Sequence, residues 1–501
     1  MMEVKERREL LEVRWEGEDG LPLGVTFDRV GASGRLVRLW AGGGRDAPRV
    51  VFDGVPKYRA EVDRKVLTSR LQGVRWEVVR VDELKAELRL GTVVLGPLSG
   101  ELVYTFFEGL SLFAEELRLR ADAPVRLKSM ERTWFGFRTG PGDNVFKGAY
   151  WKGGEGRFSC GGRRTISDSP FLYLWNGRLG LGVLCPQAGG EFYVEDRDDW
   201  TACAGLALGG SVEVPSGGVW TFPVVYCLGI RRPGDFEGLV DDLGIEGYRR
   251  LAGRRVLAVP VGDTSLRPGV DLVWGEDGPE GALRIGREVR AGSGCRRQGG
   301  RLPGRGLYIV PKGEVPEEGC LDLIAARVEE ADGVTARLDN TDLSLRKIRD
   351  LWSPHIWLFG LSGEPEEIRR YETLLEQGLR VYMLGVGGLA NYVEASGEDI
   401  RELACALREG RSFLTTGEIV ATTYKAFDRE LWLGLEWTFP IKEVQVRSEG
   451  EVLYREEPPP ELSGKKGFTF QVEDRRWVRV EAIDVVGGRC LLQPIFREGE
   501  A

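Results

Sequence analysis

Histidine is almost absent from this chain, which has a single imidazole, His355, among 501 residues. Metal centres built from several histidines are therefore excluded, and a catalytic triad or a histidine general base would have to use this one residue. His355 directly precedes the apolar run 356–359, so we expect a structural role for it. We expect no bound metal ion and no cofactor.

Thermolabile side chains are also scarce, with four methionines and asparagine only at Asn144, Asn176, Asn340 and Asn391. Together with many arginines and glutamates, this scarcity favours a thermophilic source, although a GC-rich genome also enriches arginine, glycine and alanine.

No Cys-x-x-Cys pair occurs among the eight cysteines, so neither a zinc ribbon nor a thioredoxin-like site is indicated. Four of them, Cys160, Cys185, Cys203 and Cys227, fall on separate strand-like segments. Buried free thiols are the favoured interpretation for a cytosolic chain, and disulfides of a hyperthermophile are the alternative.

Long apolar runs are missing, and no segment approaches the roughly 20 apolar residues that a membrane span needs. The first nine residues are too charged for a secretory signal, so we expect a cytoplasmic protein without a membrane partner. The net charge of −9 gives no support to a nucleic-acid partner. The oligomeric state stays open.

Short runs of period-two alternation, punctuated by glycine, dominate residues 20–230 and predict strands. One run is 74–81, and the runs 102–107 and 112–119 predict a hairpin. We therefore expect residues 1–235 to form a large β-sandwich. In strand rhythm and aromatic content, this region loosely resembles the β-supersandwich of galactose-mutarotase-like domains.

The pattern changes after this region, and residues 236–252 are expected to form a linker helix. Over 253–417 apolar strands alternate with helices, which indicates a parallel α/β layer or barrel. The clearest helix is 364–377, followed by Gly378 in the usual C-terminal position. The period returns to two over 418–501, which predicts a small C-terminal β-sandwich. The whole chain is thus expected to be a multidomain protein of β and α/β parts.

Four segments of the C-terminal half carry a family likeness, and in chain order they are 404–417, 444–452, 477–481 and 493–496. The first contains an Ala-Leu helix end followed by Gly-Arg, Phe and Thr-Thr-Gly. The others are a strand–turn–strand with Gly-Glu-Val, a Trp-x-Arg strand and a Gln-Pro-Ile-Phe strand. Residues from about 253 to 501 thereby resemble PHP-type metallohydrolases of the CehA/McbA kind, in which a β-sandwich follows an α/β barrel.

The same resemblance implies metal ligands that this chain lacks. Segment 259–263 reads Val-Pro-Val-Gly-Asp where the family has a His-x-His strand. Segment 309–311 reads Ile-Val-Pro instead of a strand followed by His-Pro, and 387–392 reads Gly-Gly-Leu-Ala-Asn-Tyr instead of Gly-Gly-Ser-Asp-x-His. Hydrocarbons and an amide cannot replace carboxylate and imidazole ligands. We therefore predict a degenerate, metal-free PHP-like domain.

Aromatic residues beside acids are the functional signal of the N-terminal half, because aromatic faces stack on sugars and paired carboxylates catalyse glycoside hydrolysis. The candidate ligand-binding residues are Trp134, Trp151 and Trp175, and the candidate catalytic residues are Glu195, Asp198 and Asp199. We predict a non-catalytic scaffold or ligand-binding protein whose ligand is a glycan or another small polar molecule. The alternative is a carbohydrate-active enzyme, such as a glycoside hydrolase, rather than a metal-dependent phosphoesterase. A third interpretation gives the aromatic residues to the core and the acids to a solvated loop.

Overall fold

The computed structural model divides the chain into two compact units. The first consists of Met1–Ile245 with two short later segments, and the second contains most of the remaining residues. The structure describes all residues except 29–35, 45–46, 52–56, 63, 139–144, 158–161, 168, 186–189, 199–200, 209–211, 230, 246, 261–269, 275–282, 286, 289–306, 311–327, 330–333, 339–343, 351, 396–398, 428, 473–474 and 498–501.

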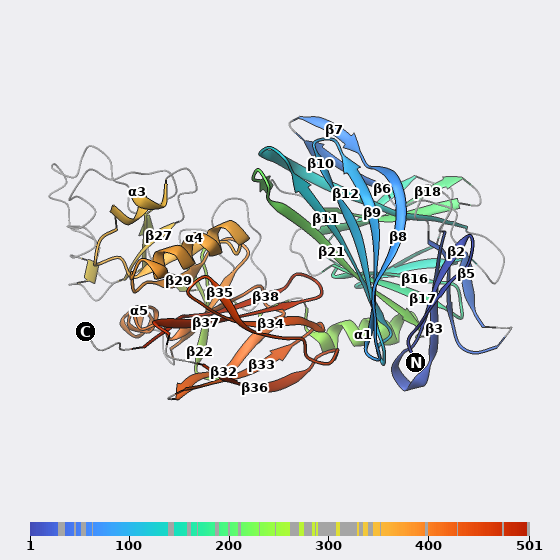
Figure 1. Cartoon of the computed structure of the whole chain (residues 1–501). Coiled ribbons are helices and arrows are strands. Elements are labelled where there is room, and N and C mark those ends of the chain that lie inside the picture. The colour runs from blue at the N-terminus through green and yellow to red at the C-terminus, as the bar shows by residue number, and fades with distance from the viewer. Residues whose placement is uncertain are drawn as a thin grey trace. The chain divides into compact units, whose positions relative to one another are not determined.

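Three antiparallel sheets build the described part of the first unit, which is drawn from blue to green in Figure 1. A five-stranded sheet follows chain order: β1 (Glu3–Glu6), β2 (Leu10–Glu16), β3 (Pro22–Asp28), β4 (Leu36–Ala41) and β5 (Arg49–Val51). A nine-stranded sheet has the order β14 (Gly154–Arg157), β13 (Gly148–Trp151), β16 (Phe171–Trp175), β17 (Gly180–Leu184), β21 (Val219–Gly229), β11 (Leu112–Ala121), β10 (Leu98–Phe107), β9 (Lys85–Leu95) and β8 (Arg70–Val81). A seven-stranded sheet has the order β15 (Arg163–Ile166), β18 (Gly190–Asp198), β19 (Thr201–Leu208), β12 (Val125–Arg138), β6 (Lys57–Val62) and β7 (Lys65–Thr68), with β20 (Val212–Val214) paired to β12.

One hydrophobic core receives side chains from all three sheets, such as Trp15, Phe106 and Phe192. The period-two patterns predict this arrangement, because alternate residues of a strand point to the same side. The predicted hairpin is confirmed as β10 and β11, with Leu102 opposite Leu117. The predicted strand at 74–81 is confirmed as part of β8.

The helix that follows the sheets, α1 (Pro233–Leu243), is shorter than the predicted linker helix over 236–252. Pro233 fits the first turn, where a backbone N–H has no helical partner, and Gly244 ends the helix with a φ of 62°. In the same unit, Cys185, Cys203 and Cys227 are buried and form no disulfide, which agrees with the favoured interpretation for these three residues. Cys160 lies outside the described residues.

The second unit combines parallel and antiparallel sheets and is drawn from yellow-green to red in Figure 1. In its described residues, a ten-stranded sheet has the order β24 (Leu283–Ile285), β23 (Leu272–Trp274), β22 (Arg254–Ala258), β30 (Ala390–Glu394), β31 (Ser412–Thr415), β38 (Arg489–Leu492), β37 (Trp477–Asp484), β34 (Ile441–Ser448) and β35 (Glu451–Glu456), with β39 (Ile495–Phe496) paired to β37. A parallel sheet has the order β25 (Arg287–Glu288), β26 (Leu307–Val310), β27 (Val334–Leu338), β28 (Leu358–Leu361) and β29 (Tyr382–Gly385). A three-stranded sheet contains β32 (Ile419–Phe427), β33 (Glu430–Trp437) and β36 (Lys465–Gln471), and the helices are α3 (Leu345–Asp350), α4 (Pro365–Glu376) and α5 (Ile400–Arg408).

The parallel sheet and its helices confirm an α/β layer in this unit, within a chain that is otherwise rich in strands. The predicted helix at 364–377 is α4, which buries Ile368, Tyr371 and Leu375 on one face and is followed by Gly378 with a φ of 86°. Strands on both sides of residue 417 belong to the same sheet, because β31 pairs with β38. The finer domain boundaries therefore remain predictions.

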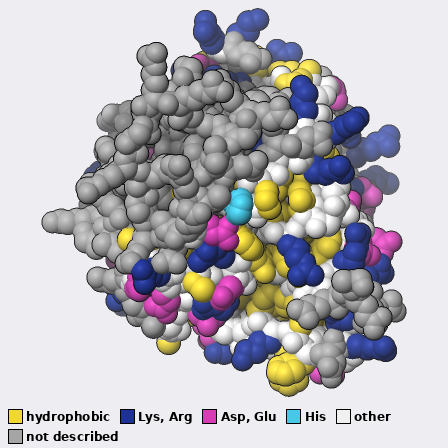
Figure 2. All heavy atoms as spheres, turned by 90° about the vertical axis from the view of Figure 1, so that its left-hand side faces the viewer, with side chains coloured by type: hydrophobic (Ala, Val, Ile, Leu, Met, Phe, Trp, Pro, Cys, Tyr) yellow, Lys and Arg dark blue, Asp and Glu magenta, His cyan; other side chains and the backbone are white. Residues whose placement is uncertain are grey.

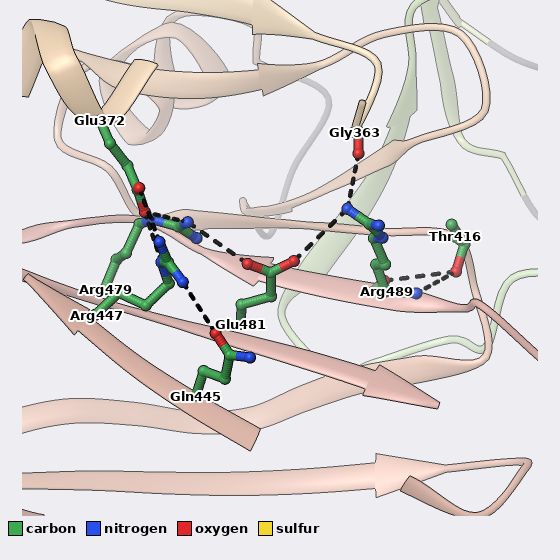
Figure 3. Close-up of polar contacts among 8 residues, drawn as sticks. All are labelled: Gly363, Glu372, Thr416, Gln445, Arg447, Arg479, Glu481 and Arg489. Atoms are coloured by element: carbon green, nitrogen blue, oxygen red, sulfur yellow. Dashed lines mark hydrogen bonds and ion pairs between the residues drawn. The ribbon is translucent and has the colours of Figure 1, made fainter. Parts of the chain in front are cut away.

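A buried ionic network fixes α4 to the ten-stranded sheet (Figure 3). The Glu372 carboxylate of α4 accepts hydrogen bonds from Arg479 Nε at 2.8 Å and from Arg447 Nε at 2.9 Å. Arg479 also pairs with Glu481 at 3.5 Å, and Arg489 pairs with Glu481 at 3.7 Å. The network therefore joins α4, which was predicted as part of the α/β domain, to β34 and β37, which were predicted as part of the C-terminal β-sandwich.

Candidate functional site

Two of the predicted ligand-binding tryptophans point to opposite faces of the nine-stranded sheet. Trp151 is the last residue of β13, and Trp175 is the last residue of β16. The strands pair antiparallel with Tyr150 opposite Tyr173. Since opposed residues share a face and neighbours alternate, Trp175 lies on the face of Tyr173 and Trp151 on the other. The guanidinium of Arg164 lies 4.4 Å from the Trp151 ring centroid, so a sugar could stack there only if Arg164 moved.

Three other predicted site residues, Trp134, Glu195 and Asp198, lie on strands of the seven-stranded sheet. Trp134 is on β12 and Asp198 ends β18, but their side chains are outside the described part, as is the whole of Asp199. Glu195, also on β18, is half-buried, and its Oε2 lies 3.8 Å from the Sγ of Cys203 on the neighbouring strand. The proposed pair of catalytic carboxylates therefore stays a prediction.

An aromatic stack covers the face of the nine-stranded sheet that carries Trp175. The Tyr173 ring lies 4.4 Å from that of Phe236 on α1 and 6.2 Å from that of Trp175, with interplanar angles of 17° and 20°. Glycines on β17 make room for the rings, because a Cβ at Gly180 would lie 1.8 Å from the Tyr173 hydroxyl and one at Gly182 would lie 2.2 Å from Phe236. The stack therefore lies flat on the strands.

Beside this stack is a pocket of about 380 Å³, which we take as the candidate functional site. Its lining combines the rings of Tyr173 and Phe236 with Cys227, Gly229 and the polar side chains of Glu18, Asp19, Ser111 and Arg231. Trp175 is one ring away from the lining. An aromatic wall with a few polar groups at its rim is typical of small-molecule sites.

The polar groups of the pocket centre on Arg231, whose guanidinium forms an ion pair with Glu18. Arg231 Nη1 is buried, and among the described residues it has no hydrogen-bond acceptor. The backbone oxygen of Arg231 accepts a hydrogen bond from the Tyr173 hydroxyl at 2.6 Å. A buried donor without an acceptor is costly unless a ligand or water accepts its hydrogen bond.

The thiol of Cys227 also faces this environment, but it is not a nucleophile. Burial raises its pKa to about 12, against the opposing effect of the nearby Arg231 charge. Since the thiolate is the reactive form, a thiol with this pKa is inert at neutral pH.

Sequence reasoning did not find this pocket. The run Arg231-Arg232-Pro233 was recognisable only as the boundary before a helix, which is where Pro233 places it. Glu18 and Ser111 carry no local signal, because turns and hairpin ends far apart in the sequence bring them to the same pocket.

In the segment where the PHP resemblance expects metal ligands at positions 390 and 392, the residue between them, Asn391, has a structural role. It is fully buried, and its Oδ1 accepts a hydrogen bond from Gly385 N at 2.7 Å. Its Nδ2 donates to Gly385 O at 2.9 Å and to Leu257 O at 3.2 Å, so the amide joins β22, β29 and β30. Within the described residues, no cluster of three His, Cys, Asp or Glu side chains could hold a metal ion.

His355 pairs with a carboxylate, since its Nδ1 lies 2.6 Å from Glu329 Oε2. Both side chains are partly exposed. A histidine–carboxylate pair holds a loop in place, but a general base also needs such a partner, so the structural role predicted for His355 stays a prediction.

A second polar cluster lies inside the core of the first unit. The Glu115 carboxylate pairs with Arg132 and accepts hydrogen bonds from the Tyr58 hydroxyl at 2.7 Å and the Tyr226 hydroxyl at 3.2 Å. The Arg132 guanidinium carbon lies 5.4 Å from the Tyr58 ring centroid and 5.7 Å from that of Tyr226. All four residues are 1% exposed, so no ligand reaches them, and we assign the cluster to the core.

The two tyrosines of this cluster, together with the equally buried Tyr104 near Glu115 and Arg132, predict a loss of stability at alkaline pH. Burial raises the pKa of Tyr58, Tyr104 and Tyr226 well above the ordinary value of 10. Their hydroxyls stay protonated in the folded state, whereas unfolded tyrosine ionises near pH 10. Stability is therefore complete below about pH 10 and falls as the pH rises further.

Ultraviolet absorbance of tyrosinate, followed together with circular dichroism, measures this effect. We expect Tyr58, Tyr104 and Tyr226 to ionise only as the first unit unfolds, and Tyr104→Phe to reduce the alkaline loss of stability. Ionisation of all the tyrosines before any loss of circular dichroism would contradict the prediction.

Comparison with known proteins gives no family assignment. No protein-family model matches the chain, and no curated protein matches it. In the described residues, no helix has the length and apolar content needed to cross a membrane.

Several of the solved structures with partial similarity are named as carbohydrate-related proteins. A galactose mutarotase related enzyme from Lactobacillus acidophilus is 9% identical, with a TM-score of 0.28 over 46% of this chain and 97% of its own. A GH36 alpha-galactosidase from Geobacillus stearothermophilus is 11% identical, with a TM-score of 0.33 over 98% of this chain and 100% of its own. At these scores the similarities establish neither a shared fold nor an activity. The mutarotase-like and PHP-like resemblances therefore stay predictions.

Proposed function

We propose that this chain is a non-catalytic binding protein whose first unit holds a small, hydroxyl-rich ligand such as a mono- or disaccharide in the pocket beside Tyr173. The observation that carries the proposal is the buried Arg231 Nη1, a donor without an acceptor among the described residues, in a pocket with an aromatic wall. A sugar hydroxyl supplies the acceptor, while the carboxylates of Glu18 and Asp19 accept hydrogen bonds from other hydroxyls.

The aromatic wall supports the same ligand class. The C–H faces of a pyranose ring are apolar and pack on aromatic rings, while the hydroxyls at its edge need polar partners. Tyr173 and Phe236 provide the rings, and Trp175 extends the stack beyond the pocket. In this proposal Trp175 contributes to glycan binding indirectly, because its ring packs against Tyr173.

Calorimetric titration of the full chain with a panel of neutral mono- and disaccharides tests the proposal. We expect at least one sugar to bind, and Arg231→Gln to weaken its binding about 10- to 150-fold, because a hydrogen bond from a charged donor contributes about 1.5–3 kcal/mol. Arg120→Gln is the matched control, because Arg120 is exposed on β11 of the same sheet and does not line the pocket.

Arg231→Gln also breaks the ion pair with Glu18, so Ser111→Ala serves as a second variant that leaves this pair intact. We expect it to weaken binding about two- to tenfold, the effect of one neutral hydrogen bond. Binding of no sugar, or equal binding by wild type and both variants, would overturn the proposal. Turnover of a glycoside would instead favour the enzyme alternative.

A further inference from the structure

The second unit contains a separate groove of about 480 Å³ that is rich in arginine and aromatic residues. It lies where β22, β30 and β31 meet the ends of α5 and β39. Its charged lining consists of four arginines, Arg254, Arg380, Arg408 and Arg411, and two glutamates, Glu394 and Glu409. The lining therefore carries two positive charges in excess.

Within the described part of the chain, pairing inside the groove uses the two carboxylates and leaves three arginines without an ion pair. Arg411 pairs with Glu409 at 2.7 Å and with Glu394 at 3.9 Å. Among the described residues, Arg254, Arg380 and Arg408 have no carboxylate within ion-pair distance, although the field of Glu394 reaches Arg254. An anion in the groove would find these three guanidinium groups without competition from a bound carboxylate.

Two of these arginines are already held by aromatic rings. The guanidinium carbon of Arg254 lies 5.0 Å from the Phe413 ring centroid, and that of Arg380 lies 5.9 Å from the Phe496 centroid. An arginine over a ring contacts it with its flat face, so the N–H groups at its edge remain free to donate. The groove thus orients two charged donors before any ligand arrives, which lowers the entropy cost of binding.

Burial makes the charge of Arg254 costly in the free protein. Desolvation lowers its pKa, and the opposing effect of Glu394 is too small to cancel this. A bound anion would compensate the desolvated charge, as carboxylates and phosphates do at other buried arginines.

The same lining offers a surface for a flat ring. Trp357, Tyr382 and Phe496 line the groove, and the rings of the last two meet edge to face at 5.5 Å. Trp357 Nε1 is buried and has no hydrogen-bond acceptor among the described residues, as is also true of the Tyr424 hydroxyl. Figure 2 shows the face that carries the single histidine (cyan), where hydrophobic side chains gather with basic ones among them.

From this combination we infer that the groove of the second unit binds a small organic anion, with a carboxylate or phosphate at Arg254 and Arg380 and a flat ring against Tyr382 and Phe496. The ligand differs in charge from the neutral sugar proposed for the first unit, and the two sites share no residue. The volume of the groove, about 480 Å³, is within the usual range of about 300–1,000 Å³ for ligand pockets.

Four probes separate the parts of this inference in calorimetric titrations of the full chain. Benzoate and phenyl phosphate carry both the ring and the anion, benzyl alcohol carries only the ring, and inorganic phosphate carries only the anion. We expect at least one of the first two to bind at least tenfold more tightly than either of the others, and added salt to weaken that binding. The stronger of the two identifies whether a carboxylate or a phosphate is preferred.

Variants place the binding at the groove. Arg380→Gln changes an exposed side chain and is expected to weaken binding roughly tenfold, since it removes a hydrogen bond from a charged donor to the anion. Arg254→Gln is expected to act at least as strongly, although it also removes a contact with Phe413. Arg369→Gln on α4 is the matched control, because Arg369 is exposed, forms an ion pair with Glu366 and lies outside the groove.

The inference is overturned if neither aromatic anion binds, if benzyl alcohol or inorganic phosphate binds equally well, or if Arg380→Gln and Arg369→Gln have the same effect. Arg231→Gln in the first unit should leave this binding unchanged. Loss of sugar binding and loss of anion binding are therefore distinguishable results.

Discussion

Arg132→Met is expected to destabilise the first unit by about 3–5 kcal/mol, the usual effect of removing one partner of a buried ion pair. Arg132 and Glu115 are each 1% exposed, so the remaining carboxylate would stay buried without its cation. The hydroxyls of Tyr58 and Tyr226 would still donate to it, but two neutral donors do not replace a guanidinium charge.

Hydrogen exchange of peptides from β11 and β12 measures this change locally, because exchange from these central strands reports opening of the unit. A loss of 3 kcal/mol corresponds to roughly a hundredfold faster exchange. Lys128→Met is the matched control on the same strand, since Lys128 is exposed and pairs with Glu61 at 3.2 Å, and we expect a change within about 0.5 kcal/mol.

A second substitution tests the cause. If the uncompensated charge is responsible, adding Glu115→Gln to Arg132→Met should restore part of the lost stability, because the amide is neutral and still accepts a hydrogen bond from Tyr58. A double variant that is no more stable than Arg132→Met would show that packing, and not charge, explains the loss.

Glu372→Gln is expected to have a comparable effect on the second unit. Glu372 is 4% exposed and is shared by Arg447 and Arg479, and Arg479 is fully buried. Without the carboxylate, the two guanidinium groups repel each other, and Glu481 is the remaining anion near Arg479. We expect a loss of about 3–5 kcal/mol, measured as faster hydrogen exchange in α4 and β37.

Glu366→Gln is the control on the same helix, because Glu366 forms an exposed pair with Arg369 that contributes at most about 0.5 kcal/mol.

The pH dependence of stability gives a further test of the role of Glu372. Burial alone would raise the pKa of Glu372, but the charges of Arg479 and Arg447 outweigh it and lower the pKa. Its contribution is therefore complete above about pH 4.5 and is lost as the pH falls. The Glu372→Gln variant should lack this acid-dependent part, and equal acid sensitivity in both proteins would contradict the assignment.

Local sequence patterns predicted the elements well where burial follows a simple period. The hairpin of β10 and β11 and the helix α4 could be predicted because alternate or helically spaced side chains enter the core regardless of which partner they meet. The end of α4 was also predictable, since Gly378 adopts the positive φ that other residues disfavour.

The candidate pocket could not be predicted in the same way. The density of aromatic residues in the sequence predicted Trp151 and Trp175 as ligand-binding residues, but the register of β13 and β16 places them on opposite faces of the sheet. Register depends on which residues pair across strands, and a shift of one residue reverses every side chain, so local composition does not determine it. Arg231 and Glu18 likewise meet only because the turn between β2 and β3 and the segment after β21 fold together.

The sequence by itself determined a β-rich chain with an α/β layer, because hydrophobic period is a local property that decides strand or helix. It also determined that no multi-histidine metal site exists, because a residue type that occurs once cannot form a cluster. Only the tertiary structure decided where charge is buried. Glu115 with Arg132, Glu372 with Arg479, and the half-buried Arg254, which has no ion pair among the described residues, look like ordinary charged residues in the sequence. Their effects on stability and binding arise from packing between residues far apart in the sequence. This packing removes water from around some charged groups, and it provides an oppositely charged partner for some of them but not for others.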